Sequence, residues 1–181
     1  TIALARRIRE RQPKLYAWLF QLRTKQKVMD QVRLLQPMVH ISGRFSAARS
    51  YVGVVLPLAW HPRNKNALIV CDLHLDPQGL LDLDAETLRR RLYTRRDDLA
   101  EGELPVPLKL IHINKCPVVA PMSVLRPADQ QRLGLDMALK HERALRLSDA
   151  QEIWRDKVQA IYAGEEFPQN DDPEQQLYDG F

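Results

Sequence analysis

Cysteine and glycine are scarce in this chain of 181 residues, and the missing motifs limit the chemistry that it can perform. The seven glycines are isolated, so no glycine-rich loop is available to cradle a phosphate. No serine lies in a nucleophile elbow, and no acidic cluster could hold the two metal ions used in phosphodiester hydrolysis. We therefore expect no complete active site. The two cysteines, Cys71 and Cys116, lie in apolar runs and are predicted to be buried free thiols of a cytoplasmic protein.

Metal-ligand spacings and membrane-spanning runs are also missing. The five histidines are scattered without zinc-ligand spacing, and no apolar run is long enough to cross a membrane or to form a signal peptide. Asp72, His74 and Asp76 would share one side of a strand and could hold a divalent ion, but this pattern is also typical of a strand that ends in a turn. A free-standing hydrolase that uses this triplet is therefore one alternative.

Charge is distributed unevenly along the chain, although the net charge is only +4. Residues 1–33 hold nine basic and two acidic side chains, which suggests a polyanionic partner. Residues 165–181 hold six acidic side chains and no basic one, which suggests a solvated linker. Because the chain begins on Thr1 without a Met and ends on Phe181 without a helix stop, we expect both ends to be cuts in a longer protein.

The first 30 residues predict helices, the second of which has a core face and a second face that carries rings and cations. Pro13 ends one helix and suits the first turn of the next, because a proline lacks the N–H that this turn leaves unused. The core stripe of the second helix is predicted at Leu15, Trp18, Leu19 and Leu22. Another face, extending to Lys27, interleaves rings with cations at Tyr16, Phe20 and Arg23. Such a face can bind single-stranded nucleic acid, or it can pack on a neighbouring domain.

The middle of the chain predicts strands, and the fold class is α+β. Five runs with strand character span residues 39–42, 51–58, 66–73, 109–113 and 118–120, which is enough for a small barrel. The stretch from Pro107 to Pro121 carries Lys109, Asn114 and Lys115 within apolar sequence, and polar side chains there usually have a reason.

Helices follow and interrupt these strands. Asp84 is predicted to cap a helix to about residue 94, whose arginines are either a solvated face or a phosphate site. Further helices are predicted after Pro127 and after Asp136, and Ser148 with Gln151 forms a capping box for the last one. The buried stripe of that last helix is predicted at Trp154, Val158, Ile161 and Tyr162.

Several strings together resemble the bacterial exodeoxyribonuclease I family. They are VHISGRF at 39–45, PLAWHP at 57–62, NALIV at 66–70, LRRRLYT at 88–94, KLIHINKCP at 109–117 and LRP at 125–127. The resemblance implies a monomeric 3′ to 5′ exonuclease of DNA repair that releases nucleoside 5′-monophosphates from single-stranded DNA. It also implies Mg²⁺, bound by a nuclease domain that would precede this chain, and no cofactor within the chain itself.

The resemblance further divides the chain and assigns residues. Residues 1–12 would end the nuclease domain, residues 13–164 would form an SH3-like barrel with an N-terminal helix pair and several C-terminal helices, and residues 165–181 would begin a linker to a helical domain. Lys25, Asn66 and Lys109 match positions that face the DNA channel in the family, and Asn114 and Lys115 lie beside them on the strand end. With Arg23, these are the expected DNA-binding residues.

A second partner implied by the resemblance is the acidic C-terminal tail of single-stranded DNA-binding protein. Arg126 matches the arginine that takes the terminal carboxylate, a task that suits the guanidinium fork. Trp18 replaces a tyrosine of this pocket and Pro121 replaces a glutamine. The alternative to a DNA-binding segment is a protein-interaction module that binds an acidic C-terminal peptide and has no DNA role of its own.

Overall fold

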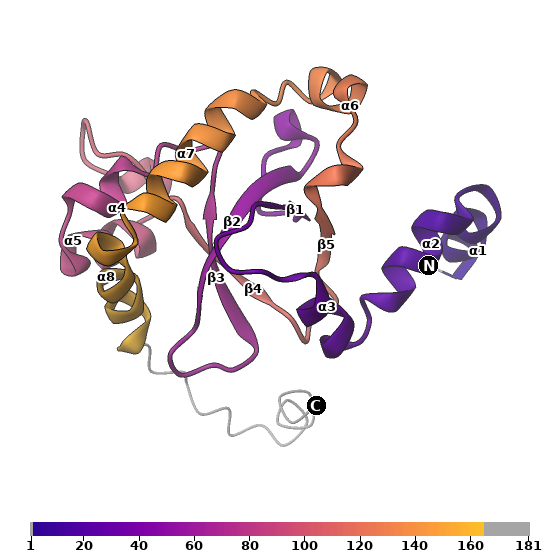
Figure 1. Cartoon of the computed structure of the whole chain (residues 1–181), viewed down its shortest axis with the longest axis horizontal. Coiled ribbons are helices and arrows are strands. Elements are labelled where there is room, and N and C mark those ends of the chain that lie inside the picture. Colours follow the sequence, from indigo (N-terminus) through magenta and orange to yellow (C-terminus); the bar gives the residue numbers. More distant parts are fainter. Residues whose placement is uncertain (1, 165–181) are drawn as a thin grey trace.

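A five-stranded antiparallel sheet forms the centre of the computed structural model, which describes residues 2–164 (Figure 1). The strands are β1 (Met38–Ile41), β2 (Val52–Trp60), β3 (Ala67–Asp72), β4 (Leu108–His112) and β5 (Val118–Pro121). They pair in the order β4-β3-β2-β1-β5. Each of the five predicted strands is confirmed to within two residues at either end. The α+β class is also confirmed.

The predicted barrel is not closed, because β4 and β5 are the two edges of the sheet and do not pair with each other. The sheet is nevertheless curved. Lys109 on β4 reaches His40 on β1, although β3 and β2 lie between these strands. The chain thus forms an open, curved sheet with a concave face.

The sheet is buried on both faces. Helices α4 (Gln78–Asp82), α5 (Ala85–Tyr93), α7 (Met137–Asp149) and α8 (Gln151–Ala163) cover one face, as Figure 1 shows. The concave face is covered by α3 (Lys25–Gln31), by the loop after β1 and by the partly buried Trp18 of α2 (Pro13–Gln21). Val28 and Phe45 belong to the same buried cluster as Val55 and Ile111. Burial on both faces explains why β2 and β3 are nearly continuous apolar runs rather than alternating ones.

The N-terminal helices differ from the prediction. Helix α1 (Ile2–Arg11) and α2 join at Pro13 as expected, but the second helix stops at Gln21 and α3 begins at Lys25. Leu22 of the predicted stripe is buried, whereas Leu15 is 48% exposed. Neither α1 nor α2 contains a buried residue, and both lie beyond the β5 edge of the sheet (Figure 1).

The later helices agree better with the sequence. Asp84 and Asp136 cap α5 and α7 by accepting from backbone N–H groups three residues on, and α6 (Pro127–Arg132) begins at its proline. The capping box at Ser148 is wrong, because α7 continues to Asp149 and the Ser148 hydroxyl donates to the Ala144 carbonyl. The predicted stripe of α8 is buried at all four positions. Helix α4 was not predicted.

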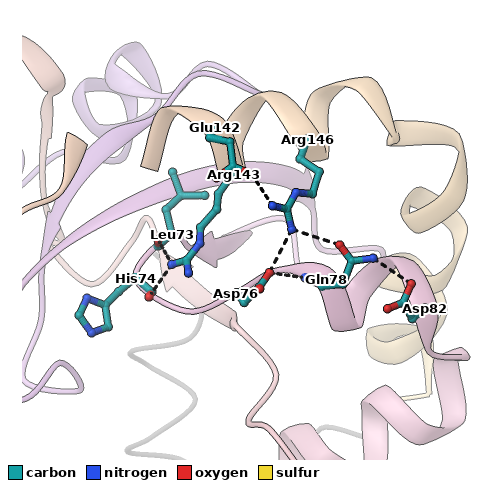
Figure 2. A network of polar contacts seen from close by, with 8 residues as sticks. All are labelled: Leu73, His74, Asp76, Gln78, Asp82, Glu142, Arg143 and Arg146. Atoms are coloured by element: carbon teal, nitrogen blue, oxygen red, sulfur yellow. Dashed lines mark hydrogen bonds and ion pairs between the residues drawn. The ribbon is translucent and has the colours of Figure 1, made fainter. Parts of the chain in front are cut away.

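A polar network fastens α7 to the turn after β3, and this turn forms one wall of the site described below. Figure 2 shows Arg143 donating to the backbone oxygens of Leu73 and His74, at 3.0 and 2.7 Å. One turn further along α7, Arg146 contacts Asp76 and Gln78 in the same view. Across residues 2–164, no helix is both long and apolar enough to pass through a membrane.

Candidate nucleic-acid interface

Two neighbouring hollows form what we call the basic groove. The larger has a volume of about 550 Å³ and lies between the loop after β1, the turn after β3 and the start of β4. The smaller, about 260 Å³, follows the outer edge of β4 toward α5 and α8. The hollows share Arg44, Leu108 and Lys109. Among the residues that line the groove, four cations (Arg44, Arg49, Arg96 and Lys109) face a single carboxylate, that of Asp72.

Lys109 lines both hollows and forms no salt bridge with a carboxylate of residues 2–164. Its Nζ lies 3.0 Å from His40 Nε2 and 4.3 Å from the centre of the Phe45 ring. Burial, and next the nearby Arg44 guanidinium, lower the pKa of Lys109 from 10.5 to about 8. The ammonium is therefore charged at neutral pH.

Arg49 and Asp72 form a buried ion pair in the wall of the groove. The guanidinium donates twice to the carboxylate, at 2.7 and 2.9 Å, and it also lies over the Phe45 ring. Asp72 Oδ1 accepts a further bond from the His74 N–H. Arg49 Nε is buried without a hydrogen-bond partner.

The divalent-ion alternative finds no support in this geometry. Asp72 is committed to Arg49, and Asp76 pairs with Arg146 at 3.3 Å. Within residues 2–164, no three His, Cys, Asp or Glu side chains lie close enough to hold a metal ion. The described part of the chain thus offers no donor set for the Mg²⁺ that the resemblance implies.

Tyr93 and two arginines belong to the groove but were not among the predicted site residues. Tyr93 ends α5, is 55% exposed and lines the smaller hollow. Arg44 follows β1, and Arg96 lies in a short 3₁₀ turn after α5. These residues come from separate elements, so only the fold brings them together with Lys109.

Asn66, Asn114 and Lys115 lie together at the far end of β4. The N–H of Ile113 donates to the Asn66 backbone oxygen at 2.8 Å, which places Asn66 opposite Ile113, the residue before Asn114. The side-chain oxygens of Asn66 and Asn114 are buried and have no hydrogen-bond partner, and Lys115 is exposed. The structure therefore splits the predicted DNA-binding residues between this cluster and Lys109.

The cysteine beside this cluster is not buried as predicted. Cys116 is exposed, with a backbone φ of 46° in the turn between β4 and β5, whereas Cys71 is fully buried. Burial raises the pKa of the Cys71 thiol. The apolar residues around Cys116 belong to strands, but the cysteine itself lies in the turn.

Two aromatic rings share one face of α2, and a cation from the turn after the helix lies against them. The Tyr16 and Phe20 rings stack with centres 5.8 Å apart, and the Arg23 guanidinium lies 3.6 Å from the centre of the Phe20 ring. Lys27 is not part of this face, because it belongs to α3 and pairs with Asp30. Lys25 begins α3 and is exposed.

The predicted peptide-binding residues lie along the β5 edge. Trp18 Nε1 donates to the Val119 carbonyl at 3.0 Å, which fastens α2 to this strand. Pro121 ends the strand. The Arg126 side chain is 78% exposed and forms an ion pair with Asp129 at 2.8 Å. A carboxylate ligand would have to compete with Asp129 for this guanidinium.

The arginines of α5 form ion pairs and a hydrogen bond with neighbouring segments of the chain. Arg90 and Arg91 pair with Glu103, and Arg89 donates to the Gly164 carbonyl at 3.0 Å. These contacts fasten α5 to the loop after it and to the end of α8. Arg89 and Arg90 are nevertheless exposed, so the solvated-face interpretation holds for them, and Arg96, which follows α5, lines the basic groove.

Comparisons with known proteins agree on one family. The family described as "Exonuclease I SH3-like domain" matches residues 23–164. Exodeoxyribonuclease I of Escherichia coli K12 is 45% identical over 184 residues, covering all of this chain and 38% of that protein. The Haemophilus influenzae enzyme is 45% identical over 185 residues, covering all of this chain and 39% of that protein. The chain thus spans about two fifths of the length of these relatives.

Solved structures give the same result. The E. coli exonuclease I complex with a dA16 oligonucleotide superimposes with a TM-score of 0.90 at 45% identity, covering 100% of this chain and 39% of that one. A zinc-bound form of the E. coli complex with single-stranded DNA has a TM-score of 0.89 at 45% identity, covering 99% and 38%.

Proposed function

Because the chain belongs to the exonuclease I SH3-like domain family, we propose that it is the single-stranded-DNA-binding segment of an exodeoxyribonuclease I. The observation that carries the proposal is the basic groove, in which the cations Arg44, Arg96 and Lys109 form no ion pair with any carboxylate of residues 2–164. Uncompensated cations attract the phosphate backbone of a nucleic acid whatever its sequence.

The other groups of the groove suit single strands rather than duplexes. The exposed Tyr93 ring can stack on an unpaired base, and stacking tolerates any base because every base has a π-face. An exonuclease that must process every sequence requires contacts of this kind.

The whole protein would degrade single-stranded DNA from the 3′ end to nucleoside 5′-monophosphates, in the cytoplasm and in DNA repair. Its Mg²⁺ and its catalytic carboxylates would lie in a nuclease domain that precedes residue 13. The segment would be inactive by itself and monomeric, with its acidic residues 165–181 leading to a further domain. The predicted stretch 165–181 lies outside the described residues.

Binding of labelled oligo-dT to the 181-residue chain, followed by fluorescence anisotropy, tests the proposal. We expect the affinity to fall steeply with salt and unlabelled duplex to compete poorly. Lys109→Gln should weaken binding and reduce the salt slope by about 0.7, the contribution of one phosphate contact on a single strand. Arg155→Gln, which removes an exposed cation of α8, is the matched control and should change neither. Salt-independent binding or a preference for duplex would refute the proposal.

A second proposed partner is the acidic tail of single-stranded DNA-binding protein, at the β5 edge. The exposed Arg126 guanidinium favours it, because an arginine fork can take a terminal carboxylate bidentately. Arg126→Ala should abolish binding of a tail peptide that ends in Phe and leave oligo-dT binding intact. If the peptide binds and oligo-dT does not, the chain is instead a protein-interaction module.

A further inference from the structure

His40 is a buried titratable residue of β1 whose two ring nitrogens are both engaged. Its side chain lies on the concave face of the sheet, and the residue is only 5% exposed. Nδ1 lies 2.9 Å from the Val118 carbonyl oxygen, and Nε2 lies 3.0 Å from Lys109 Nζ. Because a carbonyl only accepts, Nδ1 must carry the proton and Nε2 can only accept. The neutral imidazole therefore receives a hydrogen bond from the Lys109 ammonium.

The second contact of the Lys109 ammonium is also uncharged. It lies over the Phe45 ring, and this ring is fixed in place because it covers Gly53, where an added Cβ would lie 2.5 Å from a ring atom. The His40 ring meets Phe45 edge-on, with centres 5.7 Å apart. The nearest anion, Asp72, is committed to Arg49. The ammonium is thus held on two sides by groups that do not cancel its charge.

We infer that His40 is a positioning residue that holds the charged Lys109 ammonium in the basic groove for contact with a DNA phosphate. A carboxylate at this place would hold the lysine equally well, but it would neutralise the charge that the phosphate requires. A lysine side chain without a partner would lose more conformational entropy on binding DNA. The inference rests on the proposed function for its ligand, whereas the His40–Lys109 contact can be tested without DNA.

The protonation states suit this role near neutral pH. Burial and the adjacent Lys109 charge lower the pKa of His40 to about 4, so the ring stays neutral. Lys109 faces Arg44 and Arg49, which lower its pKa, and Asp72, which raises it. Because the pKa of Lys109 is about 8, the groove loses one charge above that pH, while its arginines keep theirs.

Two substitutions separate the two hydrogen bonds of His40. The side-chain amide of Asn reaches the position of Nδ1, so His40→Asn keeps a donor for Val118 and removes the acceptor for Lys109. The amide of Gln reaches the position of Nε2, so His40→Gln keeps an acceptor for Lys109 and removes the donor for Val118. A positioning role predicts that Asn is the damaging substitution, whereas a merely structural role through Val118 predicts the reverse.

Two readouts are needed, both on the 181-residue chain. By NMR titration without DNA, we expect the pKa of Lys109 to fall in His40→Asn, because an acceptor for its charged form is lost, and to change little in His40→Gln. At neutral pH, oligo-dT affinity should fall about tenfold in His40→Asn and about twofold or less in His40→Gln. Equal losses in both variants, or a larger loss in His40→Gln, would overturn the inference.

The unmodified chain gives a control that does not depend on how the variants fold. Between neutral pH and about pH 9.5, its salt slope for oligo-dT should decrease by about 0.7, whereas that of Lys109→Arg should stay constant. An unchanged slope in the unmodified chain would refute a role for the Lys109 charge. If the chain does not bind oligo-dT at all, the proposed function fails, and the NMR comparison alone then decides whether His40 holds Lys109.

Discussion

Replacing Asp72 by Asn should destabilise the fold and at the same time tighten DNA binding. The Asp72 and Arg49 side chains are only 10% and 18% exposed, and two hydrogen bonds at 2.7 and 2.9 Å join them. Removing one partner of a buried pair typically costs about 3–5 kcal/mol, because the other charge is left without compensation. The Asn oxygen still accepts one bond from Arg49, so we expect about 3 kcal/mol less free energy of unfolding.

The gain in affinity follows from the charge of the groove. Asp72 provides the one carboxylate among the residues that line it, and Asn in its place leaves Arg49 uncompensated. One additional cation changes the salt slope for a single strand by about 0.7, which corresponds to about fivefold tighter binding at 0.1 M salt. Loss of stability and gain of affinity in one variant would show that the ion pair serves the fold at the expense of binding.

Urea unfolding and oligo-dT anisotropy measure the two effects. Asp76→Asn is the matched control, because its pair with Arg146 has side chains that are 48% and 34% exposed and lies outside the basic groove. An exposed pair is worth less than about 1 kcal/mol, so this variant should differ little from the unmodified chain. Unchanged or weaker DNA binding by Asp72→Asn, or a stability loss no greater than that of the control, would refute the reasoning.

Three further predictions concern the fold around the groove. His40 takes up its proton near pH 6.5 in the unfolded state but only near pH 4 in the folded state. The free energy of unfolding should therefore fall as pH is lowered between these values, by at most about 1.4 kcal/mol per pH unit. In His40→Gln, the urea midpoint should not show this contribution to the pH dependence. Gly53→Ala should cost about 1–3 kcal/mol in urea unfolding, since its Cβ would collide with Phe45, and an unchanged midpoint would contradict the close contact. Cys116 should react with a thiol reagent in the folded chain and Cys71 only on unfolding; equal rates would be inconsistent with the burial of Cys71.

The sequence predicts the strands well because burial on both faces leaves a local signal. Val54 to Leu58 and Ala67 to Cys71 are continuous apolar segments, and the turn at 61–65 between them can only join neighbours. The same reasoning is wrong at Cys116, which lies in a turn between two apolar segments. It is also wrong at Ser148, because nothing local shows that α7 continues past it; the hydroxyl then bonds back to the Ala144 carbonyl.

The basic groove could be predicted only in part. Lys109 stands out because it interrupts a strand, but Arg44, Tyr93 and Arg96 come from a loop, a helix end and a short turn that are far apart in sequence. His40 was also missed as a partner of Lys109, since β1 and β4 are not neighbours in the sheet. No spacing in one sequence encodes contacts across two intervening strands.

The partners of the cations, rather than their number, distinguish the interface from the rest of the surface. The densest group of arginines in the sequence lies on α5, where two of them form ion pairs with Glu103 and a third donates to a backbone carbonyl. This group therefore adds little to the attraction of a phosphate. Lys109 belongs to no dense group, yet its partners are a neutral imidazole and an aromatic ring, which leave its charge intact. If this distinction is correct, Arg90→Gln should reduce stability slightly and leave oligo-dT binding unchanged. Lys109→Gln should instead weaken oligo-dT binding and leave stability nearly unchanged. Equal effects of the two variants on DNA binding would show that the groove acts only through its total charge.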